Sequence, residues 1–175
     1  MNKKQLNTNE LLVLNQLFSA GTHLGHKTSK WNSKMAPYLF GTRNGIYIID
    51  LEKTIYFLRR IVKIINCLLK DGGTIFIVGN SDNNNNFVRL LGEKFEVPYV
   101  CEKWIGGILS NWDGFSQKMQ NGKVRRRVVS FTKGLRFMNN KPSIAIVLNV
   151  NENQDAIKEI QKLNIPIVGV VDSNS

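Results

Sequence analysis

Residues 143–172 read SIAIVLNVNENQDAIKEIQKLNIPIVGVVD, and they combine two apolar runs with a segment of helical spacing. The runs at residues 143–150 and 165–172 are mostly apolar and do not alternate with polar residues, as is typical of strands buried on both faces of a parallel sheet. Asn151 and Gln154 are spaced as in a capping box, which predicts a helix start between the two runs. The apolar stripe of that helix is Ala156, Ile157, Ile160 and Leu163. A strand, a helix and a second strand in this order predict a βαβ unit.

The same alternation continues toward the N-terminus. Further strands are expected at residues 46–50, 74–79 and 97–101, and helices at about residues 9–19, at 53–70 and through 87–95. The dipeptide Asn44-Gly45 is a turn signal directly before the first of these strands. Short apolar strands separated by helices predict an α/β fold, with a doubly wound parallel sheet of about five strands and an N-terminal helix.

The length and composition suit one domain. A chain of 175 residues, of which 42% are hydrophobic, can bury a sizeable core. We therefore expect residues 1–175 to form a single α/β domain. Within it, residues 1–45 would hold the N-terminal helix and a basic loop, and residues 113–142 would form a short basic insertion. Residues 20–45 and 113–142 show no regular pattern and are expected to be irregular.

Positive charge concentrates in two windows that contain no acidic residue. The first lies between Glu10 and Asp50, and the second lies between Asp113 and Glu152. Their basic residues are Lys27, Lys30, Lys34 and Arg43, followed by Lys118, Lys123, Arg125, Arg126, Arg127, Lys133, Arg136 and Lys141. The rest of the chain is nearly balanced, so the formal charge of +11 is localised. Localised basic fields attract phosphate backbones by Coulomb attraction and counterion release, which favours a nucleic-acid partner.

Other features narrow the class of protein. Cys67 and Cys101 form neither a disulfide framework nor a CxxC metal spacing, and we expect both thiols to be reduced. No apolar run approaches the roughly 20 residues that cross a bilayer, so no membrane partner is expected. The N-terminal segment matches neither a transit peptide nor a secretory signal. Asn is abundant, at 21 of 175 residues. Together with frequent Lys and Ile, this bias is typical of an AT-rich genome, either organellar or bacterial.

Residues suited to catalysis or metal binding are few. His23 and His26 could place two metal ligands on one helical turn, but no third ligand is near in sequence, which favours structural or RNA-facing imidazoles. Asp50 and Asp172 lie at predicted strand ends without a histidine or a second carboxylate in their local motif. The serines within residues 173–175 have no base beside them in sequence. We expect no catalytic residue, no metal and no cofactor.

Two loops have a composition that suits RNA contact. Residues 27–35 (KTSKWNSKM) interleave lysines with hydroxyls, an amide and a tryptophan, so they can hold phosphates and stack on a base. Residues 103–112 (KWIGGILSNW) follow a strand and lead to Ser110 or Asn111 as a helix N-cap. The glycines of this loop allow a backbone to approach a phosphate, but the loop is equally well a tight packing turn anchored by its tryptophans.

Several motifs together resemble the bacterial-type family of small-ribosomal-subunit protein two. They are GTHLGHKTSKWNSKMAPYLFGTRNGIYIIDLEKT at residues 21–54, GGTIFIVGN at 72–80, KWIGGILSNW at 103–112 and NIPIVGVVDSNS at 164–175. They keep the family's order and fall on the elements predicted above. The resemblance implies a flavodoxin-like sheet, a non-enzymatic role in translation, and rRNA binding between the head and the body of the small subunit. It also implies neighbouring small-subunit ribosomal proteins as partners.

By position, the resemblance implies RNA-facing residues in both loops. They are Lys27, Lys30, Trp31, Asn32, Lys34, Arg43 and Asn44, and then Lys103, Trp104, Gly106, Gly107, Asn111 and Trp112. Arg125, Arg126 and Arg127 are further candidates on charge alone, although three adjacent residues of one strand cannot all face the same way.

The chain departs from the family pattern in three places. Only residues 113–142 stand where bacterial members carry a long helical hairpin, so the hairpin is expected to be reduced or absent. Residues 80–86 are polar, with one acidic and no basic side chain, where the family usually has basic ones. Relatives continue past the position of Ser175, and we expect a separate chain or a neighbouring protein to cover the strand at 165–171 instead. The short insertion and the AT-rich composition favour the mitochondrion, with the cytoplasm of an AT-rich bacterium as the alternative.

Two other functions compete with this interpretation. One is an α/β enzyme that binds a nucleotide at the carboxyl edge of the sheet through Gly106, Gly107 and Asp50, although the chain has no GxGxxG motif. The other is a free-standing RNA chaperone, which would be found off the ribosome.

Overall fold

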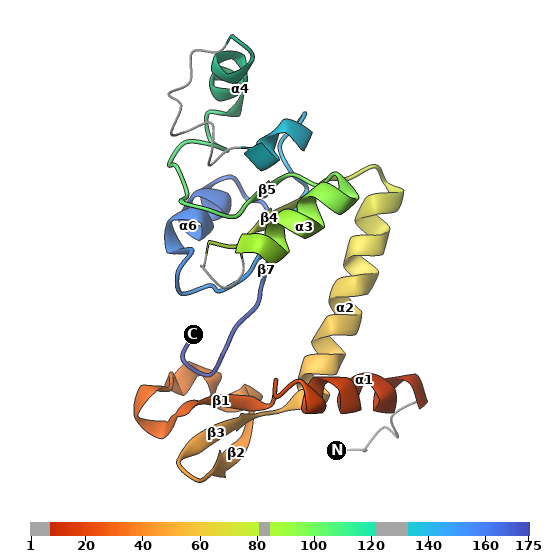
Figure 1. Cartoon of the computed structure of the whole chain (residues 1–175), viewed down its shortest axis with the longest axis vertical. Helices are drawn as coiled ribbons and strands as arrows, with labels where there is room; N and C mark the ends of the chain where they lie inside the picture. The colour runs from red at the N-terminus through yellow and green to blue at the C-terminus, as the bar shows by residue number, and fades with distance from the viewer. Residues whose placement is uncertain (1–7, 81–84, 122–132) are drawn as a thin grey trace. The chain divides into compact units, whose positions relative to one another are not determined.

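The computed structural model describes residues 8–80, 85–121 and 133–175 (Figure 1). The chain divides into two compact units. The first contains the described residues up to Asn66 together with Asp172–Ser175, and the second is Cys67–Val171. The single-domain organisation expected from the sequence stays a prediction.

The second unit is built on a four-stranded parallel sheet. Its strands are β4 (Ile75–Val78), β5 (Tyr99–Val100), β6 (Ile144–Val147) and β7 (Ile167–Gly169), in the spatial order β5-β4-β6-β7. Numbered along the unit, this order is 2-1-3-4, which matches the first four strands of the flavodoxin-like order. The predicted α/β class with a parallel sheet is therefore confirmed.

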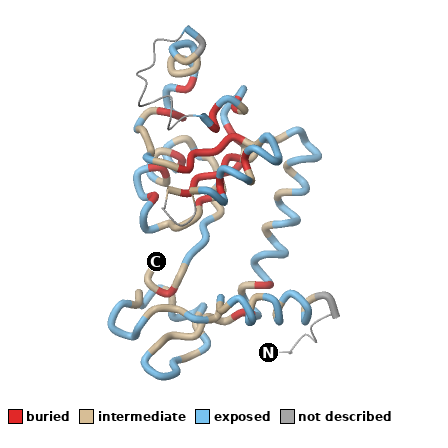
Figure 2. Tube along the Cα trace, viewed as in Figure 1, coloured by how far each residue is buried: buried red, intermediate tan, exposed pale blue. Residues whose placement is uncertain are grey.

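Apolar side chains pack on both faces of this sheet. Successive side chains of β4 point to opposite faces, so they enter two different apolar clusters. Phe76 and Val78 join the apolar cluster that includes Ala156 of helix α6 (Gln154–Lys162). Ile77 joins the cluster that includes Val88 of helix α3 (Asn85–Phe95). Figure 2 shows buried residues concentrated along these strands. This burial on both sides explains why the strands are continuously apolar in sequence.

The strand predicted at residues 46–50 forms, but it does not belong to the parallel sheet. It is β3 (Ile46–Ile49), which pairs antiparallel with β1 (Leu24–Lys27) and β2 (Leu39–Arg43) in the order β1-β3-β2 within the first unit. Asn44 and Gly45 both have positive φ, at 51° and 74°. Two positive φ values in a two-residue loop are the signature of a tight hairpin, so the chain reverses and β3 pairs with β2.

The segments expected to be irregular contain regular structure. Besides β1 and β2, the first basic window holds the 3-10 helices η1 (Thr28–Lys30) and η2 (Ser33–Tyr38). The second holds α4 (Trp112–Gln120) and η3 (Lys133–Phe137). The hairpin predicted to be reduced or absent falls largely on residues 122–132, which lie outside the described residues.

Helix boundaries follow the sequence with one correction. Helix α1 is Thr8–Ser19 and α2 is Leu51–Lys70, close to the expected ranges. The N-cap of α4 is Asn111, which is one of the two residues, Ser110 and Asn111, that the sequence offered for this position. The capping box proposed for Asn151 and Gln154 is wrong, because α6 begins at Gln154 after the N-cap Asn153. None of the helices in the described ranges has the length and apolar character needed to cross a bilayer.

Candidate nucleic-acid interface

The basic loop of the first unit exposes most of its predicted RNA-facing residues. The exposed ones are Lys27, Lys30, Lys34, Arg43 and Asn44. They belong to β1, η1, η2, and the hairpin that joins β2 to β3. No acidic residue lies between Glu10 and Asp50 in the sequence, so this window places cations at the surface without an opposing charge of its own.

Trp31 and Asn32 occupy a different position from these cations. The Trp31 ring is half-buried and rests against Tyr47, with ring centroids 4.6 Å apart and a 33° tilt. The Asn32 side chain donates to the Ser175 carbonyl at 2.8 Å and accepts from the Lys34 amide at 3.0 Å. Asn32 thus holds the loop together from inside the unit.

His26 is surrounded by the segment Asp172–Ser175. Its backbone N–H donates to Ser173 Oγ at 2.7 Å. Its ring nitrogen Nδ1 lies 3.3 Å from Asp172 Oδ2, and Nε2 lies 3.2 Å from Asn174 Nδ2. The ring of His23 instead stacks on Phe18 at 4.2 Å. Each imidazole therefore has its own structural surroundings, and across the described ranges no group of three or more His, Cys, Asp or Glu side chains could hold a metal ion.

The grouping of Ser173, His26 and Asp172 is not a catalytic triad. In a triad the serine and the carboxylate contact different imidazole nitrogens, so that a proton can pass through the ring. Here Ser173 Oγ, at 3.5 Å, and Asp172 Oδ2 both face Nδ1. Ser173 is also fully buried, with 0% of its surface exposed. The geometry supports a structural clasp and gives no nucleophile that a substrate could reach.

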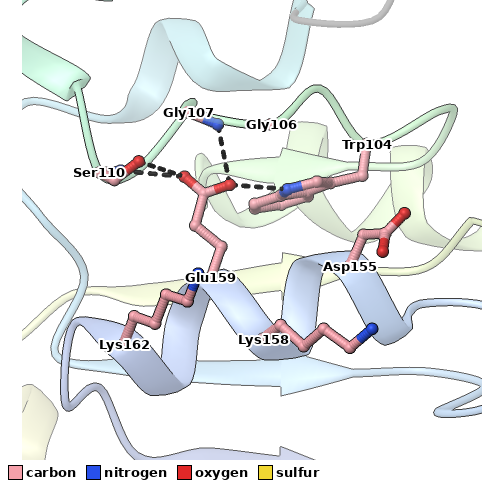
Figure 3. Close-up of a pocket in the computed structure, with 8 residues that line it drawn as sticks. All are labelled: Trp104, Gly106, Gly107, Ser110, Asp155, Lys158, Glu159 and Lys162. Atoms are coloured by element: carbon pink, nitrogen blue, oxygen red, sulfur yellow. Dashed lines mark hydrogen bonds between the residues drawn. The ribbon is translucent and has the colours of Figure 1, made fainter.

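In the second unit, the loop at residues 103–112 closes around a carboxylate that the sequence did not indicate. Figure 3 shows Glu159 of α6 pointing into the loop. One carboxylate oxygen accepts from Trp104 Nε1 at 3.0 Å and from the Gly107 amide at 2.9 Å. The other accepts from the Leu109 amide at 2.9 Å, the Ser110 amide at 3.0 Å and Ser110 Oγ at 3.1 Å. A single side chain thus satisfies five donors of the loop.

The charge state of Glu159 follows from these contacts. Burial by itself would raise the pKa of Glu159 by penalising the carboxylate. The hydrogen bonds from Ser110, Gly107, Trp104 and Leu109 outweigh burial and hold the pKa below its usual value. Glu159 is therefore an anion at neutral pH. The loop amides that could have cradled a phosphate already bind this internal anion.

The tryptophans of this loop are used for packing. Trp104 donates its indole N–H to Glu159 and packs edge-on against Phe76, with centroids 6.1 Å apart. Trp112 is 6% exposed and donates its indole N–H to the Asn139 carbonyl at 3.3 Å. The exposed residues from the predicted set here are Lys103, Gly106 and Asn111.

A pocket of about 420 Å³ lies between this loop and α6. Trp104, Gly106, Gly107 and Ser110 line it from the loop, and Asp155, Lys158, Glu159 and Lys162 line it from the helix (Figure 3). Two carboxylates balance the two lysines, so the pocket has no net charge to attract a phosphate. The remaining predicted residues, Arg125, Arg126 and Arg127, lie outside the described residues.

The chain is similar to known small-subunit ribosomal proteins. A family model described as ribosomal protein S2 matches residues 17–127 and 115–175. The small ribosomal subunit protein uS2 of Rhodospirillum centenum is 34% identical over 187 residues, which cover 93% of this chain and 72% of that protein. The protein of the same name from Gluconobacter oxydans is 33% identical over 186 residues, covering 93% of this chain and 70% of its own length.

Proposed function

The chain belongs to the ribosomal protein S2 family and is a structural protein of the small ribosomal subunit, and we propose that it is held there by binding rRNA. The observation that carries the proposal is the exposure of Lys27, Lys30 and Lys34 in a window without acidic residues. Cations of this kind neutralise phosphates and release condensed counterions, which supplies affinity without base-specific contacts.

Each unit carries its own proposed RNA-facing residues. In the first unit they are the exposed cations, Asn44 at the hairpin and the half-buried Trp31. In the second unit, Lys103, Gly106 and Asn111 are exposed. We assign Trp104, Gly107 and Trp112 the task of fixing the shape of the loop, since their N–H groups or rings are engaged inside the protein. Arg125, Arg126 and Arg127 complete the proposed set by charge.

Two finer assignments belong to the proposal as well. The first is a site between the head and the body of the small subunit, which rests on the family resemblance. The second is residence in a mitochondrial ribosome, which rests on the abundance of Asn, Lys and Ile. Both named relatives are bacterial. The genome that carries the reading frame separates the organelle from a bacterium with an AT-rich genome.

The geometry disfavours the rival nucleotide-binding enzyme. Gly107 donates its N–H to Glu159, so this amide is occupied. The Asp50 carboxylate accepts from the amides of Glu52 and Lys53 at the start of α2 and forms an ion pair with the Lys53 amine at 3.0 Å. Asp50 therefore caps a helix. A thermal-shift screen with nucleotides tests this rival: a bound nucleotide at a hundredfold excess over its Kd would stabilise the protein by about 2.7 kcal/mol. A free RNA chaperone would instead be found off the ribosome.

The proposed function is tested by the salt dependence of binding to a small-subunit rRNA transcript. Replacing Lys27, Lys30 and Lys34 with Gln should reduce the slope of log K against log salt by about 2–3, since each neutralised phosphate contributes roughly 0.7–0.9. The matched control replaces Lys63, Lys70 and Lys94, which are equally exposed but lie in the charge-balanced part of the chain. Equal slopes for the two triple variants would contradict the proposal.

A further inference from the structure

Ser173 contacts the chain at both ends of the segment 27–31, which forms part of the basic loop in the first unit. Ser173 Oγ accepts from the His26 backbone N–H at 2.7 Å, just before the loop. The Ser173 carbonyl accepts from the Asn32 backbone N–H at 2.9 Å, just after Trp31. The five residues 27–31, which include Lys27, Lys30 and Trp31, are therefore spanned by two hydrogen bonds to a single residue far along the chain.

Gly25 makes this approach possible. A Cβ atom built on Gly25 would lie 2.7 Å from Ser173 Oγ, which is closer than real Cβ atoms come to other atoms, and 3.0 Å from Ser173 Cβ, which is a tight contact. It would also lie 3.1 Å from the Tyr47 carbonyl oxygen. A side chain larger than hydrogen at position 25 would push Ser173 away from the loop.

The contacts between Asp172–Ser175 and the basic loop extend to η2, which carries Lys34. Asn32 Nδ2 donates to the Ser175 carbonyl at 2.8 Å, while Asn32 Oδ1 accepts from the amide of Lys34 at the start of η2. The segment Asp172–Ser175 is itself closed, because the Ser175 amide donates to the Asp172 carbonyl and the Asp172 amide donates to Ser175 Oγ. A compact turn thus fixes the loop on both sides of Asn32.

We propose that Ser173 is a positioning residue for RNA binding, and that Asp172–Ser175 holds the basic loop ready to meet several phosphates at once. This inference rests on the proposed function. Lysine side chains on a loop of fixed shape lose less conformational freedom on binding than the same side chains on a mobile loop. Without the contacts from Asp172–Ser175, the lysines would keep their charge, but they would no longer bind several phosphates at the same time.

The test uses the full chain and compares Ser173→Ala with Ser143→Ala. Ser143 is a matched control in the second unit, because its Oγ also accepts a backbone N–H, from Thr74 at 3.2 Å, and also abuts a glycine, Gly73, at 3.0 Å from the ideal Cβ. Affinity for a small-subunit rRNA transcript is measured from low to moderate salt, with hydrogen exchange at the amides of His26 and Asn32. Gly25→Ala is a second variant that displaces Ser173 without removing a polar group.

We expect Ser173→Ala and Gly25→Ala to weaken RNA binding by about tenfold and to lower the salt slope by roughly two, as the lysines disengage from phosphates. Exchange at His26 and Asn32 should rise in both, and Ser143→Ala should keep the wild-type slope. If both test variants keep the wild-type slope of log K against log salt, the inference is overturned. This holds when the affinity is unchanged, and also when only the fraction of protein able to bind falls. If wild-type protein itself shows no salt-dependent binding, the proposed function fails, and the inference fails with it.

Discussion

The Glu159 carboxylate lies 3.0 Å from the indole nitrogen of Trp104, although the two residues are 55 positions apart in the chain. Through this contact and four more, a helix on one face of the parallel sheet holds the glycine-rich loop. A backbone nest that would attract an external anion is filled by an internal one. The exposed residues of the loop are therefore presented on a fixed frame.

Removing the charge of Glu159 should destabilise the protein. Glu159→Gln keeps the length of the side chain but turns an amide NH₂ toward loop N–H groups that need an acceptor. We expect a loss of about 2–3 kcal/mol in the free energy of unfolding, since hydrogen bonds to a charged group contribute roughly 1.5–3 kcal/mol each and part of the loss is recovered from water. Urea denaturation measures it. Glu152→Gln, at an exposed position, is the control and should stay within about 0.5 kcal/mol of wild type.

The stability supplied by Glu159 should depend on pH in a defined direction. Its pKa is lowered in the folded protein, so the unfolded chain binds the proton first as the pH falls. The contribution is fully present above the unfolded glutamate pKa of about 4.3 and is lost as pH falls through the lower folded value. The gap in unfolding free energy between wild type and Glu159→Gln should be constant near neutral pH and should close in acid. A gap that widens in acid would contradict this sign.

Tyr99 should show a late ionisation. Burial is the main cause, and the hydrogen bond from its hydroxyl to Glu93 at 2.8 Å adds to it, so that the pKa of Tyr99 is raised to about 12. Because the folded pKa exceeds the unfolded value of about 10, this stabilisation is complete below pH 10 and is lost as pH rises toward 12. Ultraviolet titration of tyrosinate should show a step near pH 12 that Tyr99→Phe removes. If the variant titrates like wild type, the assignment is wrong.

Gly92 should not tolerate a side chain. A Cβ at this position in α3 would lie 1.9 Å from Tyr99 Cδ1, and the Tyr99 ring is 2% exposed and cannot move into solvent without opening the core. Gly92→Ala should cost about 1–3 kcal/mol by overpacking. Gly106→Ala is the control, because nothing lies within 4 Å of its ideal Cβ. The midpoints of thermal unfolding of the two variants are compared, and equal midpoints would count against this close packing of Gly92 on Tyr99.

The parallel sheet was predictable because its signals are local. Residues 74–79 and 143–150 are apolar without alternation, which only a strand buried on both faces requires, and they became β4 and β6. The assignment of residues 46–50 to the same sheet was wrong. The dipeptide Asn44-Gly45 directly before an apolar strand is itself a strong hairpin signal, and it would have indicated that β3 pairs with the preceding strand β2.

The contacts that shape the two loops were not predictable from local patterns. Glu159 lies on the helix α6, where a charged residue ordinarily faces water, and nothing in its neighbours marks it as a loop ligand. Ser173 meets His26 across 147 positions. Both contacts depend on which distant segments meet in the fold. The hydrophobic periodicity of one sequence reports local structure and does not show which distant segments meet. The exposure of the lysines was predictable, because a charged side chain without an oppositely charged partner is almost never fully buried.

We propose that rRNA binding holds this small-subunit protein in the ribosome. The most direct test is sedimentation of a tagged full-length chain from its own cells or organelles through a sucrose gradient, with detection of small-subunit rRNA in each fraction. We expect the chain to travel with the small-subunit peak and to be released from it by nuclease treatment of the rRNA. A chain that stays at the top of the gradient, away from small-subunit rRNA, would show that rRNA does not hold it in the small subunit.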